Sequence, residues 1–368
     1  MSTGGGRIPS LDGLRGISIL MVLAGHLAGT RGFPLSAAAG NRTEVAAIGV
    51  HVFFVISGFL ITGLLLAELA ATDRVRLTRF YFRRTLRIFP PYYVLIGALV
   101  LAQTVGFLFL TPSDVAHAVT YTSNYDAARS WSIGHTWSLG VEEQFYLLWP
   151  ACLVLLGARR GLIAAIAVVL VTPLVRLAEL HLFPAYMDGI GARFETVADA
   201  IAIGCVLACT RDWLHRQPAY MRFLESRLFL VVPVAIFAGT MTGQHPHVAY
   251  VVGFPLANVA TALAVDWAVT FPEGLPGRVL NSTPLVFIGL ISYSLYLWQQ
   301  PFLNRTGEAA WNAFPTNVLL AFTFAVASYY VVERPSLALR KILERRRAAT
   351  RRAPVPLTSA VLQVRRPL

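Results

Sequence analysis

The chain has 368 residues, of which 56% are hydrophobic and 14% charged, and its net charge is +12. A charged fraction this far below the roughly 25% of soluble domains excludes an ordinary soluble enzyme. Apolar runs recur along the chain, and each run of about 20 residues can cross a hydrocarbon core about 30 Å thick. The sequence therefore predicts an all-α polytopic membrane protein, whose basic residues serve membrane topology and not nucleic-acid binding.

We predict a bundle of about ten transmembrane helices with both termini in the cytoplasm. Segment 73–87 has six arginines and one acid, and segment 334–368 has ten bases and one acid, whereas the alternate connections contain few bases. The positive-inside rule places the basic segments in the cytoplasm. No cleavable signal peptide is evident, so the first run is expected to remain as a span. The predicted spans lie near residues 12–30, 46–68, 89–110, 141–157, 161–179, 194–210, 228–243, 248–270, 285–303 and 314–332.

Two parts are expected along the chain. Residues 1–340 form one membrane domain. Residues 341–368 form a basic cytoplasmic tail, expected as an amphipathic helix followed by disorder, that is attracted to anionic lipid of the inner leaflet. The lipid bilayer is thus an expected partner. No metal site is predicted, because the three cysteines lie in apolar runs with neither zinc-like nor disulfide-like spacing: Cys152, Cys205 and Cys209.

The first predicted span contains two ionisable residues in the stretch "LDGLRGISILMVLAGH" (11–26). Arg15 and His26 are separated by about three helical turns, so they share one helix face and lie about 16 Å apart along the axis. Arg15 fits either a topology anchor or a phosphate-binding residue at the cytoplasmic end of the helix. His26 lies deep in the span, which indicates either a functional site or a neutral histidine bonded to a neighbouring helix.

A basic and aromatic cluster, "RFYFRRTLRIFPPYYV" (79–94), precedes the third predicted span. Arg83, Arg84 and Arg87 have helical i,i+3 and i,i+4 spacings, so they form one basic surface. Bases interleaved with aromatic rings suit a nucleotide, whose phosphates bind arginine and whose ring stacks. A positive-inside segment with an interfacial aromatic belt explains the same pattern equally well.

The stretch "HTWSLGVEEQFYLLWP" (135–150) enters the fourth predicted span. His135, Trp137 and Ser138 precede the span, and adjacent glutamates at 142 and 143 begin it on the external side. Acids at a helix N-terminus are favourable by themselves. The functional interpretation is that Glu142 faces inward near His26, where a histidine and a glutamate make a general base with its orienting partner.

Hydrogen-bonding side chains crowd the ninth predicted span in "ISYSLYLWQQPFL" (291–303). This density indicates either a hydrated cavity or bonds between helices. Among them we single out Tyr293, Tyr296 and Gln299 as candidate substrate contacts, together with Trp137 and Ser138.

These clusters, in this order, resemble the acyltransferase 3 family of bacterial membrane acyltransferases. The match consists of an arginine and a histidine separated by ten residues in "SLDGLRGISILMVLAGH", followed by five further blocks that extend to about residue 335. Those blocks are "GVHVFFVISGFLITGLLL", "FYFRRTLRIFPPYY", "TWSLGVEEQFYLLWP", "ISYSLYLW" and "YYVVERP".

The resemblance implies an enzyme of the bacterial cytoplasmic membrane that transfers an acyl group, usually acetyl, from cytoplasmic acyl-coenzyme A to a hydroxyl group. Typical acceptors are envelope or exported sugars and, in some members, macrolide antibiotics. No cofactor is permanently bound, and acetyl-coenzyme A is the donor substrate. By this analogy His26 is catalytic, Glu142 matches the acidic position of the family, and the coenzyme A phosphates bind Arg15, Arg83, Arg84 and Arg87.

The chain departs from the family pattern at Gln299, where many members have a histidine. Glutamine cannot carry a proton in catalysis, so this position is not expected to act as a base. Many relatives also have a fused extracytoplasmic esterase-like domain, so this protein is expected to act alone or with a separate extracytoplasmic partner.

Other functions remain open at this stage. Intramembrane His and Glu residues also suit a proton-coupled transporter or a flippase of a glycolipid or metabolite, although we find no internal repeat of the kind that transporters often show. A succinyl or longer acyl-coenzyme A donor would bind through the same phosphate-binding residues. It would differ only in the pocket that holds the acyl group. A non-catalytic scaffold fits less well, because Arg15, His26 and Glu142 are all present.

Overall fold

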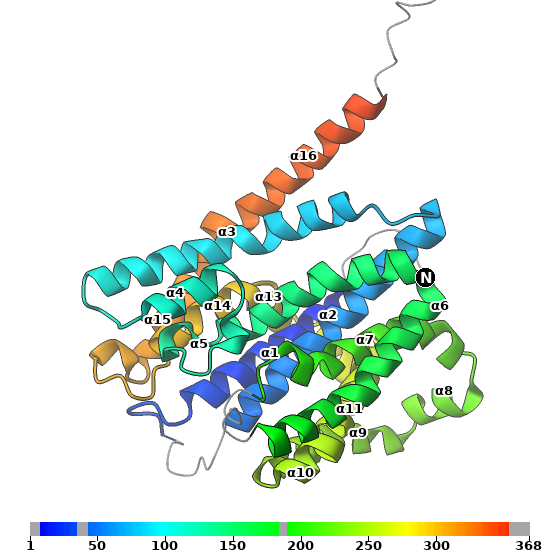
Figure 1. Cartoon of the computed structure of the whole chain (residues 1–368), viewed down its shortest axis with the longest axis horizontal. Coiled ribbons are helices and arrows are strands. Elements are labelled where there is room, and N and C mark those ends of the chain that lie inside the picture. The colour runs from blue at the N-terminus through cyan, green and yellow to red at the C-terminus, as the bar shows by residue number, and fades with distance from the viewer. Residues whose placement is uncertain (1–7, 35–42, 184–189, 353–368) are drawn as a thin grey trace, which may run out of the picture.

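The computed structural model describes residues 8–34, 43–183 and 190–352. All secondary structure in these ranges is helical, which confirms the predicted all-α fold (Figure 1). The helices that cover the membrane domain are α1 (Pro9–Leu27), α2 (Thr43–Thr72), α3 (Leu77–Thr104), α4 (Pro112–Val119), α5 (Trp131–Gly134), α6 (Thr136–Leu182), α7 (Phe194–Leu214), α8 (Pro218–Glu225), α9 (Val231–Met241), α10 (Pro246–Val248), α11 (Phe254–Thr270), α12 (Leu275–Leu280), α13 (Thr283–Leu290), α14 (Ser292–Phe302), α15 (Thr316–Ser328) and α16 (Arg334–Arg352).

Six helical segments of the described chain are long and apolar enough to cross a membrane. There are seven candidate spans if helical segments Pro218–Glu225 and Arg227–Met241 form one span together. The axes of these two segments differ by 67°. The multi-pass architecture is thereby supported, whereas the count of ten and the cytoplasmic termini stay predictions. Three predicted spans fall outside the six. Span 228–243 belongs to the bent pair, span 194–210 (α7) carries several charged residues, and span 285–303 is broken at Ile291.

The longest helix contains a sharp break that separates two predicted spans. Gly157 in α6 has φ 74° and ψ 171°, a conformation that residues with a Cβ rarely adopt. The halves before and after this residue correspond to predicted spans 141–157 and 161–179. The first half carries Glu142 toward the interior of the bundle, and the second half approaches α7.

Close helix packing places α1, α2 and α7 against one another. A Cβ added at Gly49 of α2 would lie 2.4 Å from the carbonyl oxygen of Ser18 in α1, and one at Gly58 would lie 2.0 Å from that of Ile201 in α7. Small residues at helix contacts let backbones approach in this way inside a membrane. The contacts fix α1 and α2, which contribute one wall of the cavity described below.

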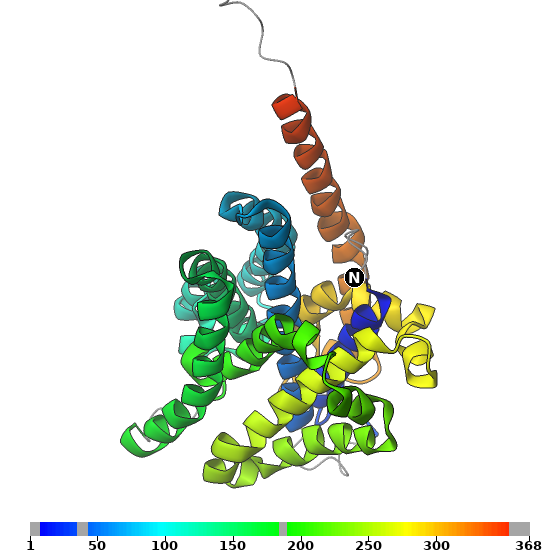
Figure 2. The same cartoon turned by 90° about the vertical axis from the view of Figure 1, so that its right-hand side faces the viewer.

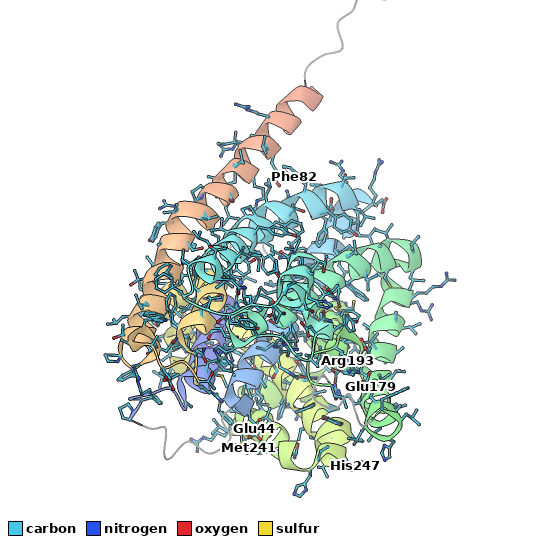
Figure 3. All side chains as sticks on the ribbon, turned by 60° about the vertical axis from the view of Figure 1, so that its left-hand side comes forward. Glu44, Phe82, Glu179, Arg193, Met241 and His247 are labelled. Carbon is cyan, nitrogen blue, oxygen red and sulfur yellow. The ribbon has the colours of Figure 1, made fainter. Side chains whose placement is uncertain are left out.

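Ion pairs join α6 to α7 near one end of the bundle. The buried Arg176 of α6 pairs with Asp199 of α7 and also donates to the carbonyl oxygen of Thr196 at 2.6 Å. Nearby, Arg193 pairs with Glu179 at 2.8 Å, and Figure 3 labels both residues side by side. These charges have protein partners, so they account for the position of the helices without a ligand.

The arginine cluster of segment 79–94 lies on a helix and not in a connecting loop. Helix α3 begins at Leu77, twelve residues before the predicted span at 89, and continues through Pro90 and Pro91. Helix α16 contacts α3 and then extends away from the bundle (Figures 1 and 2). The part of the tail after residue 352 lies outside the described residues, whereas residues 341–352 are helical.

Candidate active site

A cavity of about 840 Å³, counted with its open mouth, lies among α1, α2, α3, α6 and α14. Each of the four polar clusters found in the sequence contributes to its walls. Its apolar walls include Phe53, Phe54 and Leu60, which come from α2. The polar residues that line it are Arg15, Ser57, Arg84, Arg87, Ser138, Glu142, Glu143, Tyr146, Ser292, Tyr293 and Tyr296.

Three arginines from two helices meet in this cavity. Arg15 comes from α1, and Arg84 and Arg87 come from α3. Within the described ranges, no hydrogen bond and no ion pair engages these three guanidinium groups, although Arg84 stacks 4.2 Å from the ring centroid of Tyr146. Three sets of free N–H donors therefore face one cavity, which is the arrangement that an anion with several oxygens requires.

Arg83 has a different environment from its neighbour Arg84. Its guanidinium pairs with Glu344 of α16, and Arg83 is absent from the cavity wall. The helix geometry explains the difference, because adjacent residues of a helix point about 100° apart. The structure thus brings three of the four predicted phosphate-binding arginines together and places the fourth at the contact with α16.

Glu142 is held inside the cavity by a short network. Ser57 donates a hydrogen bond to Glu142 Oε1 at 2.7 Å, and the hydroxyl of Tyr146 donates to Ser57 Oγ at 3.1 Å. Arg84 and Arg15 lie close enough for their charges to attract the Glu142 carboxylate. The residue also lies deeper than its predicted position at a span entrance, because α6 begins at Thr136.

His26 lies near the other end of α1 with partners of its own. Its Nδ1 is 2.8 Å from Oε1 of Gln299 in α14, and its ring packs edge-on against Trp131 with centroids 5.5 Å apart. Arg305 donates to the carbonyl oxygens of Gly25 and His26, which are among the last carbonyls of α1. These contacts fix both the helix end and the imidazole.

The expected pairing of His26 with Glu142 is not found among the hydrogen bonds of residues 8–34 and 43–183. Each side chain has another partner, namely Gln299 for His26 and Ser57 for Glu142. The reason is geometric, since Glu142 lies beside Arg15, which is about 16 Å along α1 from His26. The orienting partner of His26 is therefore Gln299, which the sequence suggested only as a substrate contact.

The other predicted substrate contacts are divided between the cavity and the core. Ser138 and Tyr296 line the cavity and share a hydrogen bond of 2.5 Å, and Tyr293 donates to the carbonyl oxygen of Ile88 at 2.8 Å. Trp137 instead packs edge-on against Phe54, 6.0 Å between centroids. Three of the five predicted contacts thus reach the cavity, while Trp137 and Gln299 support it from outside.

Sequence reasoning missed several residues that complete this region. Tyr146 could have been found, because it lies one helical turn after Glu142 on the same face of α6. Ser57 gave little signal as a single hydroxyl in an apolar run. Trp131 and Arg305, which contact His26 or its carbonyl, lie in connections that sequence patterns do not place in space.

The cavity ends before it reaches His26. Tyr296 lines the cavity, and Gln299, which holds His26, follows it by about one helical turn on α14. The ring of Tyr296 packs against the buried His135 with centroids 5.5 Å apart, and its hydroxyl donates to the His135 carbonyl oxygen at 3.1 Å. On α14 the cavity wall therefore ends at Tyr296, about one turn before the residue that bonds His26.

Comparison with known proteins supplies independent information. A family model described as an acyltransferase domain, the acyltransferase 3 family, matches residues 8–334. The O-acetyltransferase OatA of Staphylococcus aureus is 29% identical over 361 residues, and the putative peptidoglycan O-acetyltransferase YrhL of Bacillus subtilis is 27% identical over 357 residues. The alignments cover 89% of this chain but only 57% and 54% of these relatives, so the chain spans just over half of their length. No solved structure matches significantly.

Proposed function

The chain belongs to the acyltransferase 3 family, and from this premise we propose that it is a membrane O-acyltransferase of the bacterial cytoplasmic membrane. It transfers an acyl group, in our proposal acetyl, from cytoplasmic acyl-coenzyme A to a hydroxyl group. The acceptor is a carbohydrate or an exported or secondary metabolite. The observation that carries the proposal is the cavity toward which Arg15, Arg84 and Arg87 present guanidinium groups that make no hydrogen bond or ion pair within the described residues.

The donor fits the cavity in one orientation. Coenzyme A carries several phosphate groups at one end and a thioester at the end of a long, flexible arm. The three arginines bind the phosphates, because guanidinium groups form paired, charge-assisted hydrogen bonds with phosphate oxygens. The arm then follows α1 toward His26, over the rise of about 16 Å that separates Arg15 from this histidine.

His26 supplies the chemistry in this proposal. The amide oxygen of Gln299 can only accept a hydrogen bond, so Nδ1 of His26 carries the proton and Nε2 has a free lone pair. Nε2 removes the proton of the acceptor hydroxyl, whose oxygen attacks the thioester carbon. The new C–O bond replaces the C–S bond, and the proton passes to sulfur as coenzyme A leaves as a thiol. Transient acylation of Nε2 itself is an equivalent route that needs the same free lone pair.

The acceptor side is supported by the relatives. YrhL is named a putative peptidoglycan O-acetyltransferase, which favours a carbohydrate hydroxyl as the acceptor here. Trp131 and Arg305 lie beside His26, and an aromatic ring with a guanidinium group suits a sugar. A separate extracytoplasmic partner would deliver the acceptor if the protein does not act alone.

The test is release of coenzyme A by the purified full chain in lipid nanodiscs, supplied with labelled acetyl-coenzyme A. We expect the wild type to bind the donor and to release free coenzyme A slowly. His26→Ala is expected to keep donor affinity and to lose at least about 100-fold in release rate, because general base catalysis contributes roughly 10²–10⁴-fold.

His181→Ala is the matched control, since His181 is an exposed histidine near the end of α6. It should behave as the wild type. Donor binding without any His26-dependent release, even with carbohydrate acceptors present, would contradict the catalytic role. Absence of donor binding would contradict the enzyme and favour a transporter.

A further inference from the structure

Helix α16 approaches the arginine cluster from outside the cavity. It follows α15 through a π-helical turn, Tyr329–Glu333, contacts α3, and then extends from the bundle (Figures 1 and 2). Phe82 of α3 lies on the side of the bundle from which α16 extends (Figure 3). On α16, Arg340 and Glu344 are four residues apart and therefore share one face. Glu344 pairs with Arg83, which identifies this face as the one directed at α3.

One nitrogen of the Arg340 guanidinium group has no hydrogen-bond partner within the described chain. This nitrogen is Nε, and it is buried. The charge of Arg340 interacts with that of Glu344 but is repelled by those of Arg83, Arg84 and Arg87. A buried donor without a partner is costly, and so are like charges brought together. A bound anion would remove both costs.

The acidic groups nearby do not supply that anion. Glu344 is already paired with Arg83, and the buried Glu333 accepts a hydrogen bond from Ser294 at 2.7 Å. Glu142 and Glu143 line the cavity together with Arg84. Within the described residues, the Nε of Arg340 thus remains without a hydrogen-bond partner.

We propose that Arg340 is a fourth phosphate-binding arginine, and that α16 completes the mouth of the donor site. The ligand class is a nucleotide with several phosphate groups, which in the proposed function is coenzyme A. Glu344 pairs with Arg83, and a bound phosphate competes with it for that guanidinium. The inference rests on the proposed function for the identity of the donor, but it concerns a helix that lies almost wholly beyond the matched residues 8–334.

The experiment measures the dissociation constant of coenzyme A for the full chain in nanodiscs of phosphatidylcholine. Arg340→Ala should weaken binding roughly tenfold, the usual effect of losing one charge-assisted hydrogen bond. Arg345→Ala removes the same charge from an exposed position of the same helix and should change affinity less than about twofold. Glu344→Gln should strengthen binding, because it removes the competitor for Arg83.

The outcomes separate this inference from the proposed function. Equal affinities of Arg340→Ala and Arg345→Ala, with a clear loss in the double variant Arg84→Ala and Arg87→Ala, would overturn the role of Arg340 and leave the donor site intact. Absence of binding by the wild type would overturn the proposed function itself. An unchanged coenzyme A affinity, with a weaker association of the variant with vesicles of phosphatidylglycerol, would show that the phosphate is a lipid headgroup.

A folding defect in Arg340→Ala would be recognised by a lowered thermal midpoint. Arg340→Lys then provides the test, because it keeps the charge and loses the forked donor geometry. The coenzyme A affinity of Arg340→Lys should be weaker than that of the wild type and of Arg345→Ala. It should be stronger than that of Arg340→Ala. A wild-type affinity in Arg340→Lys together with an unchanged affinity in Glu344→Gln would contradict the proposal.

Discussion

At the scale of single residues, the main finding is the partner of His26. The glutamine at 299 stands where many members of the resembled family have a histidine, and in the structure it is the hydrogen-bond partner of His26. Its Oε1 accepts from His26 Nδ1 at 2.8 Å, and its Nε2 has no partner among the described residues. In the proposed function, the amide therefore holds His26 in one tautomer and does not itself transfer a proton.

Substitution of this glutamine tests the orienting role. In Gln299→Leu the side chain keeps its approximate volume and loses the acceptor, so His26 is no longer held in one tautomer. We expect a loss of turnover of roughly 10- to 100-fold, with unchanged donor affinity, measured by single-turnover release of coenzyme A. The adjacent Gln300→Leu is a comparison at a residue that bonds Trp131 and not His26. A larger loss in Gln300→Leu than in Gln299→Leu would contradict the role.

Asp114 is a second residue whose hydrogen bonds explain its contribution to the structure. It lies in α4, where burial opposes its charge, but hydrogen bonds from Ser130 and Thr111 outweigh this and hold the pKa of the Asp114 carboxyl below its usual value. Ser130 directly precedes Trp131, whose ring contacts His26. The carboxylate therefore anchors the connection that positions Trp131.

The pH dependence of stability follows from this depressed pKa. A carboxyl whose folded-state pKa is lowered contributes stability above its ordinary pKa of about 4, and this contribution is lost as the pH falls through the folded-state value. We expect Asp114→Asn to have a lower thermal midpoint than the wild type at neutral pH, and the difference to shrink below about pH 4. A difference that stays constant between neutral pH and about pH 3 would show that the charge of Asp114 is not involved.

At the scale of helices, the sequence predicted which residues share a face better than where helices begin. The spacing of Arg15 and His26 and the shared face of Arg84 and Arg87 on α3 follow from helical periodicity, whereas Arg83 turned out to face α16. The expected pair of His26 and Glu142 failed because it depended on the start of α6, which lies at Thr136 instead of near 141. A shift of five residues moves a side chain about 7.5 Å along a helix.

Glycines in α2 give a matched test of helix packing. A Cβ at Gly58 would meet the carbonyl oxygen of Ile201 at 2.0 Å, whereas a Cβ at Gly63 meets nothing within 4 Å. We expect Gly58→Ala to destabilise the protein by about 1–3 kcal/mol through overpacking, and Gly63→Ala to be neutral or stabilising by roughly 0.5–1 kcal/mol. Thermal melting in one detergent compares the two variants. Equal midpoints would show that the contact between α2 and α7 relaxes without cost.

At the scale of the whole molecule, the sequence predicted a multi-pass helical bundle, and the structure supports it. Hydropathy could not predict the breaks at Gly157 and Ile291, because both are local backbone events inside apolar segments. It also could not show that α1, α2, α3, α6 and α14 enclose one cavity, since the contacts between these helices depend on side-chain packing across the bundle.

The predicted orientation can be tested by accessibility. We expect a cysteine at Glu308, an exposed residue of a base-poor connection, to react with a membrane-impermeant maleimide in intact cells. A cysteine at Lys341, exposed on α16, should react only after the membrane is opened. The background has alanine at Cys152, Cys205 and Cys209, which are free thiols. The reverse labelling pattern would invert the topology and place the arginine cavity outside the cytoplasm.

The contact of Arg305 with the end of α1 has a mechanical consequence. The guanidinium holds the carbonyl oxygens of Gly25 and His26, and its residue belongs to the connection between α14 and α15. These hydrogen bonds join that connection to the C-terminal end of α1. A displacement of this connection would therefore be transmitted to the backbone of Gly25 and His26 and not only to its own residues.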